Sequence, residues 1–419
     1  MKALMSVEGI HEYCLMHNQL KVLTCPMPFK GVVGVMITYL VGSRHEQQGQ
    51  TGATHFLEHM MFKGSQKYQK ALGNDIDHLE AVGAQINAST WMDRTNYYAL
   101  LPSEHLGLVI DMEADRMRHA LLRPEDVASE KVVILNEHDQ GENAQHSVLL
   151  KALWAKAFQQ HGYHHPTIGW RQDIENTTVR DLRQYYDQYY HPSMATLTLV
   201  GDISPDWASS IHHSFDGIAN HDVVVPTLIE PAQTKERRFA IQHASPEDLC
   251  ALAFKIPKAL DQDFIACELL ASLLGDGPIS LLAKACVDQG LVRWVYADAC
   301  ASYEPGLLTI VAAVSPGVDV RTVEDVIWGV IDSVMNEGVK QDRLQQVVMQ
   351  MEADQVFQND GIMDQLQWLN EAIAMGCWHQ PFTRLQHIKQ LNVSDIQSAC
   401  QQYCQRTRAT VGHLIRESQ

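Results

Sequence analysis

Two stretches of similar pattern determine the expected fold: VRDLRQYYDQYYHPSMATLTLV at 179–200 and VSDIQSACQQYCQRTRATVGHL at 393–414. In each, a polar helical segment leads through a turn rich in Arg, His or Pro into a β-strand. At an offset of 214 residues without a gap, the identities include Val179, Asp181, Tyr189, Ala195 and Thr196 with Val393, Asp395, Tyr403, Ala409 and Thr410. Self-similarity at a fixed offset indicates an internal duplication of about 210 residues.

Length and composition are those of a globular protein with more than one core. The chain has 419 residues, of which 46% are hydrophobic and 20% charged, so two or more domains are expected. The net charge of −18 argues against a nucleic-acid-binding protein, which needs a basic face, and is compatible with basic substrates. The 21 histidines make a metal site worth seeking.

The hydropathy pattern of the sequence shows no membrane span and no export signal. No apolar run approaches the roughly 20 residues of a membrane span, and residues 1–28 show no signal-peptide core. The nine cysteines are scattered, odd in number and without a CxxC pair, which predicts free thiols in a reducing compartment. We therefore expect a cytoplasmic protein, with a periplasmic one as the alternative if a signal has been removed.

The order of elements predicts two α+β domains of similar fold. Residues 19–40 indicate two strands around a Pro/Gly turn, and the β-branched run at 32–41 predicts a strand buried on both faces. Residues 220–238 combine turn formers with a basic end and are interpreted as a linker. A further helix is predicted over 71–81, and the second half opens with a strand at 239–242.

The strongest chemical feature is His55-Phe56-Leu57-Glu58-His59 within a helix predicted over 51–62. Histidines at i and i+4 project from one helix face and suit a shared Zn²⁺. Glu58 flanks that face and could take a proton from a water that the metal acidifies, without being a ligand. The alternative is a solvated polar stripe opposite an apolar core side.

Two further carboxylates lie in the helix predicted from Pro124 to Gly141. Glu130 and Glu137 are two turns apart and so share one face, and the apolar block between them would bury the helix. His55, His59 and Glu137 would make a His₂Glu set with an open fourth position, the geometry of hydrolytic zinc sites. The alternative for a lone glutamate is a surface charge.

On these motifs the chain resembles the pitrilysin-like zinc metallopeptidases with an inverted HxxEH motif, in particular the short chains related to mitochondrial processing peptidase. The likeness is specific from about Leu20 to Asp202 and weaker beyond. It includes the 78 residues that separate His59 from Glu137. Further matches are Gly42, Ser43, Gly52, His55 through Gly64, Asn87, Ala88, Thr90, Thr95, Tyr97, Glu130, His165, Pro166, Ile168 and Gly169.

The resemblance implies two homologous α/β-sandwich domains, each a mainly antiparallel sheet with helices packed on it. It implies a zinc-bearing peptidase domain at 1–219, a linker at 220–238, and a homologous domain at 239–419 without zinc ligands. One zinc per chain would be held by His55, His59 and Glu137, with Glu58 and Glu130 as catalytic residues; the alternative for Glu130 is to orient a ligand. A substrate peptide would add as a strand beside Asn87, Ala88, Ser89 and Thr90, inside an enclosed chamber.

One departure from the family affects the expected activity. Self-sufficient members carry an Arg and a Tyr in the second half that stabilise the oxyanion. Aligning on Gly290 and Leu291 places Cys286 and Arg293 at those positions. We therefore expect the catalytic subunit of a dimer whose homologous partner supplies Arg and Tyr, or a homodimer, with no nucleic-acid partner and no membrane span.

The sequence leaves two other functions as alternatives. A non-catalytic assembly subunit of the same fold is the main alternative, but such members usually lose the ligands or the glutamate at position 58, which this chain retains. A thiol enzyme using Cys25 or Cys286 lacks a His/Asn context in the sequence.

Overall fold

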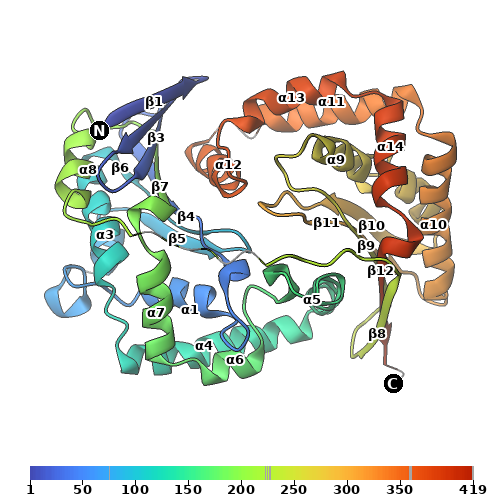
Figure 1. The fold of residues 1–419 in the computed structure, drawn as a ribbon, viewed down its shortest axis with the longest axis horizontal. Helices are drawn as coiled ribbons and strands as arrows, with labels where there is room; N and C mark the ends of the chain where they lie inside the picture. Colours follow the sequence, from blue (N-terminus) through green and yellow to red (C-terminus); the bar gives the residue numbers. More distant parts are fainter. Residues whose placement is uncertain (75, 222, 224, 226–227, 358–360, 418–419) are drawn as a thin grey trace. The chain divides into compact units, whose positions relative to one another are not determined.

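The computed structural model describes residues 1–74, 76–221, 223, 225, 228–357 and 361–417. The chain divides into two compact units (Figure 1). The first combines Met1–His138, His165–Thr227 and Gln358–His379; the second combines Asp139–His164, Leu228–Phe357 and Gln380–Gln419. Within the described residues, no helix has both the length and the apolar character needed to cross a bilayer.

The first unit is built on a seven-stranded sheet in the order β1-β2-β3-β7-β4-β6-β5. Only the β3–β7 pair is parallel, and the other neighbours are antiparallel. The strands are β1 (Lys2–Val7), β2 (Ile10–Leu15), β3 (Leu20–Pro26), β4 (Val32–Tyr39), β5 (Gln85–Thr90), β6 (Thr95–Pro102) and β7 (Ala195–Gly201). The hairpin of β1 and β2 was not predicted from the sequence.

The second unit repeats this sheet with five strands in the order β10-β11-β9-β12-β8. Again one pair, β12–β8, is parallel and the others are antiparallel. Its strands are β8 (Arg237–His243), β9 (Leu249–Lys255), β10 (Val292–Ala299), β11 (Leu307–Val314) and β12 (Ala409–Arg416). Strands β3, β7, β4, β6 and β5 of the first unit thus correspond to β8, β12, β9, β11 and β10, which confirms the predicted pair of similar α+β domains.

The repeated stretches fold identically at their helix starts. Helices α7 (Val179–Tyr189) and α14 (Val393–Tyr403) each begin with a capping box, in which the residue before the helix and the aspartate three positions later bond each other's backbone N–H. The caps are Thr178 with Asp181 and Asn392 with Asp395. The strands that follow, β7 and β12, each begin at an alanine, and these two alanines are 214 residues apart in the sequence.

Strand β4 is covered on both faces, as its apolar run predicts. Val33, Val35 and Ile37 belong to the main core with helices α1 (Ala53–Met61) and α3 (Leu106–His119). The alternate residues face helix α12 (Ile362–Ala374), which packs on β4 and β7 (Figure 1). A Cβ at Gly34 would lie 2.5 Å from Leu366 Cδ1, so glycine is what lets α12 approach the sheet.

Each unit takes one helical segment from the other half of the sequence. Helix α12 follows the second sheet's strand β11 in the chain, yet it packs on the first sheet. Helix α5 (Gln145–Ala157) precedes the predicted linker, yet it packs on β8, β9 and β12. The predicted linker at 220–238 includes residues 222, 224, 226 and 227, which lie outside the described residues, and strand β8 begins within it at Arg237.

Local backbone geometry explains two differences from the predicted helices. Helix α1 begins at Ala53 rather than Thr51 because Gly52 is left-handed at φ 86°. The helix predicted over 71–81 is instead a 3₁₀ turn at Lys70–Leu72 and helix α2 (Ile76–Ala81), with left-handed Gly73 between them.

All nine cysteines are free, as predicted. The remaining helices complete the two units. These helices are α4 (Pro124–Asn143), α6 (Arg171–Asn176), α8 (Trp207–Phe215), α9 (Gln262–Gly275), α10 (Val320–Glu337), α11 (Gln341–Phe357) and α13 (Gln380–Gln390).

Replacing Gly34 by alanine is expected to destabilise the protein by about 1–3 kcal/mol, because the added methyl overpacks the buried contact with α12. The measurement is the urea midpoint of unfolding. Gly217→Ala is the matched control, since no atom lies within 4 Å of the Cβ position at that exposed glycine. Equal midpoints for the two variants would show that α12 does not pack closely on Gly34.

Candidate metal centre

Helix α1 presents the HxxEH residues on the side opposite its apolar face. Phe56, Leu57 and Met60 are buried in the core of the first unit. The side chains of His55 and His59 are only 13% and 21% exposed, so these rings do not form a solvated stripe. Their ring centroids lie 4.8 Å apart, as the i, i+4 spacing predicts.

Helix α4 brings a carboxylate to the two imidazoles. Glu137 Oε1 lies 3.7 Å from His55 Nε2, and Glu137 Oε2 lies 3.6 Å from His59 Nε2. A tetrahedral Zn²⁺ with ligands at about 2.1 Å holds neighbouring donor atoms roughly 3.4 Å apart. The three donors also lie within 4.8 Å of one another, so their chemistry and their separations both fit a zinc ion.

Glu130 lies behind the histidines rather than among the three converging donors. Its Oε2 is 3.1 Å from His59 Nδ1, and its other oxygen forms an ion pair with Lys63. The side chain is 9% exposed. A carboxylate on the far nitrogen of a ligating histidine fixes the ring's tautomer and orientation. The geometry therefore suits Glu130 to orienting His59.

Glu58 lies beside the three donors but is held by a different partner. Thr90 Oγ1 donates to Glu58 Oε2 at 2.5 Å. Burial raises the pKa of Glu58, and the bond from Thr90 and the charge of His59 oppose that rise. A partly desolvated carboxylate held in place is a suitable proton acceptor.

Two of the three donors, His55 and Glu137, are held in metal-binding protonation states. Burial lowers the pKa of His55 to about 4, with Glu137 opposing and His59 assisting. The pKa of Glu137 is lowered by its hydrogen bond with His59. Burial disfavours the charged ring of His59, but the bonds to Glu137 and Glu130 outweigh it and raise its pKa. A neutral His55 and an ionised Glu137 are the forms that coordinate metal.

The residues predicted to bind substrate lie on an edge strand. Asn87, Ala88, Ser89 and Thr90 form the end of β5, which is the last strand of its sheet and pairs with β6 alone among the described strands. Strand β5 also contacts α1, and Thr90 reaches Glu58. An unpaired strand edge next to a candidate proton acceptor is suited to β-augmentation by an extended peptide.

A buried arginine supports this edge and was not found from the sequence. Arg94 Nη1 donates to Ser89 Oγ at 2.9 Å and to Asn96 Oδ1 at 2.7 Å. Its Nη2 donates to Glu371 Oε1 of helix α12 at 2.5 Å. No local pattern links residues that are 277 positions apart, so only the fold identifies the pair.

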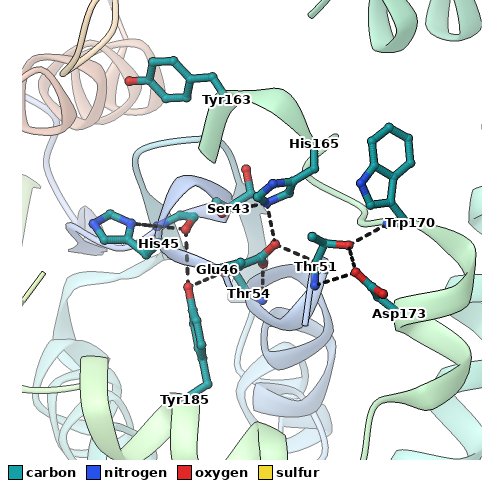
Figure 2. Close-up of polar contacts among 12 residues, drawn as sticks. Ser43, His45, Glu46, Thr51, Thr54, Tyr163, His165, Trp170, Asp173 and Tyr185 are labelled. Atoms are coloured by element: carbon teal, nitrogen blue, oxygen red, sulfur yellow. Dashed lines mark hydrogen bonds and ion pairs between the residues drawn. The ribbon is translucent and has the colours of Figure 1, made fainter. Parts of the chain in front are cut away.

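The start of helix α1 is held by polar side chains, which Figure 2 shows. Glu46 accepts from the backbone N–H of Gly52 at 2.7 Å and of Thr54 at 2.8 Å. Its Oε2 also lies 3.0 Å from His165 Nε2. His165 carried part of the family resemblance, whereas Glu46 was not predicted as a site residue.

Cys286 and Arg293 occupy the two positions where the family resemblance predicts an Arg and a Tyr, and neither side chain is placed as a free hydrogen-bond donor. Cys286 is buried in a short π-helix at Ala283–Val287. Arg293 lies on β10, where Nη1 is 3.2 Å from Glu247 Oε2 within the second unit. Its guanidinium is thus paired with a carboxylate.

Comparison with known proteins assigns the family. The sequence model described as Insulinase (Peptidase family M16) matches residues 21–170, and the model described as Peptidase M16 inactive domain matches residues 176–351. Together these matches cover most of the chain. The chain therefore belongs to peptidase family M16, the insulinase and pitrilysin-like family, which confirms the resemblance seen in its motifs.

Individual relatives agree with this assignment. The zinc protease PqqE of Helicobacter pylori is 25% identical over 413 residues, 96% of this chain and 92% of that protein. The human mitochondrial-processing peptidase subunit beta is 30% identical over 189 residues, 45% of this chain and 38% of that protein. The crystal structure of a protease from Helicobacter pylori superimposes with a TM-score of 0.90 at 24% identity, covering 97% of this chain and 99% of the other.

Glu137→Gln is expected to weaken zinc binding at least about tenfold, because a neutral amide replaces the anionic ligand. Zinc per chain after dialysis against a chelator measures the effect. Glu125→Gln, which changes an exposed glutamate on the same helix, should retain as much zinc as the unchanged chain. Equal retention by both variants would exclude Glu137 as a ligand.

Proposed function

We propose that this chain is a zinc-dependent endopeptidase that hydrolyses peptides or unfolded polypeptide segments. The observation that carries the proposal is the convergence of His55, His59 and Glu137 from two helices at separations that suit one Zn²⁺. The presence of zinc proteases among its relatives supports the same class.

The proposed site assigns a separate task to each residue. His55, His59 and Glu137 hold one zinc per chain, and zinc when bound supplies a Lewis acid that acidifies water and polarises a carbonyl. Glu58 accepts the proton of the attacking water, and Thr90 holds its carboxylate in place. Glu130 keeps the ring of His59 oriented through Nδ1.

The substrate is proposed to bind as an extended strand along β5. Its backbone would pair with the free edge at Asn87–Thr90, which tolerates many sequences because main-chain hydrogen bonds supply the affinity. The end of β5 nearest Glu58 is fixed through Ser89 by Arg94. A peptide in this register would lie next to the proton acceptor.

We further propose that hydrolysis requires a partner chain. Cys286 is a buried thiol, and Arg293 is paired with Glu247, so neither offers a free donor for an oxyanion. A homologous chain, or a second copy, would supply the missing Arg and Tyr and enclose the substrate in a chamber.

Glu58→Gln is expected to keep zinc and to reduce hydrolysis by at least about a hundredfold, since it removes the general base but no ligand. The measurements are zinc content and turnover of a quenched peptide. Glu80→Gln, an exposed glutamate on α2, should behave as the unchanged chain. Turnover by Glu58→Gln near the unchanged rate would rule out this base.

The purified chain alone is expected to cleave a quenched peptide weakly or not at all, because its oxyanion donors are missing. Adding a homologous chain that carries the Arg/Tyr pair should raise the rate. The assay compares the chain before and after removal of zinc, at several chain concentrations. Rapid zinc-dependent turnover by the monomeric chain would contradict the partner requirement.

A further inference from the structure

A buried carboxylate and a buried imidazole meet at the start of helix α1 (Figure 2). The side chains of Glu46 and His165 are 0% and 7% exposed. His165 Nε2 lies 3.0 Å from Glu46 Oε2 and 2.9 Å from the carbonyl oxygen of Ser43. Since both neighbours are acceptors, Nε2 carries the proton and donates. We name this pair of residues the Glu46–His165 clamp.

The clamp replaces the usual side-chain cap of a helix. The residue that precedes α1 is Gly52, and a Cβ there would lie 2.4 Å from the carbonyl oxygen of Ile168. The Ser, Thr or Asp that normally caps a helix start is therefore excluded by the backbone of the neighbouring loop. Glu46 supplies the acceptor instead, through bonds from the N–H groups of Gly52 and Thr54.

The placement of α1 depends on this end of the helix. Helix α1 has nine residues, too few for a helix to be stable on its own. The positive end of the helix dipole attracts the buried carboxylate. The N–H of His165 donates to Glu46 Oε2, which offsets part of the cost of removing that oxygen from water. Both bonded groups are close in sequence to His55, the first candidate zinc ligand.

We propose that Glu46 and His165 are positioning residues of the metal site, acting through α1. Two of the donors, His55 and His59, are on α1, while Glu137 comes from α4. Their separations of 3.6 and 3.7 Å leave little room for a shift of one helix against the other. The clamp thus sets zinc affinity without touching the ion. This inference rests on the proposed zinc-binding function.

The main test is Glu46→Gln, measured on the full chain without any activity assay. Zinc is removed, and the dissociation constant for added Zn²⁺ is measured by competition with a chromogenic chelator. The visible absorption of the Co²⁺-loaded chain reports the ligand geometry. We expect zinc affinity to fall about tenfold or more, as for changes of outer-shell partners, with a changed Co²⁺ spectrum.

The second unit offers a matched control. Glu324 is likewise a buried glutamate, 2.9 Å from a histidine nitrogen, His413 Nε2. Glu324→Gln should lower the melting temperature of the metal-free chain but leave zinc affinity within twofold. If it weakens zinc binding as much as Glu46→Gln does, general destabilisation explains both, and the positioning role is overturned.

A second variant keeps the test decisive if Glu46→Gln does not fold. His165→Leu conserves volume and removes the donor, and it should weaken zinc binding severalfold. Unchanged affinity and an unchanged Co²⁺ spectrum in the folded variants would overturn the inference alone. Failure of the unchanged chain to bind zinc would overturn the proposed function and this inference together.

Discussion

The contact between helix α1 and the first sheet is the constraint on which the site depends. Phe56, Leu57 and Met60 are buried in that core, and this burial turns the opposite face of a short helix toward α4. Because the helix has only one apolar side, the orientation of His55 and His59 follows from packing rather than from any attraction between the ligands. The carboxylates that meet the rings come from α4, whose own apolar residue Ile134 is buried in the same core.

The duplicated halves share a topology but have diverged at the equivalent helix. Strand β4 is followed by α1, and the corresponding strand β9 is followed by α9. Helix α9 buries most of its residues, among them Phe264, Leu269 and Leu270. A helix that is apolar on most sides serves packing and leaves no polar face for a ligand. One fold thus carries a candidate metal site in the first unit and a packed core in the second.

Much of the fold and of the candidate site could be predicted from local sequence patterns. The duplication, the buried strand β4, the i, i+4 histidines and the two glutamates of α4 all arise from spacing along the chain, which local backbone geometry converts directly into faces. The start of helix α1 was predicted two residues too early. The left-handed glycine at position 52 packs against the backbone at Ile168, and that contact is distant in sequence. Helix α2 was predicted too long, since Gly73 interrupts an otherwise helical composition.

Residue types at short or repeated spacings were enough to predict the candidate donor set, the family and the pair of α+β domains. The folded chain was needed to find which helix packs on each sheet, that Glu46 caps α1, and that Glu371 holds Arg94 beside the candidate substrate edge. These contacts join residues through the packing of separate elements. Periodicity reports which face of an element is buried, but not which other element covers it.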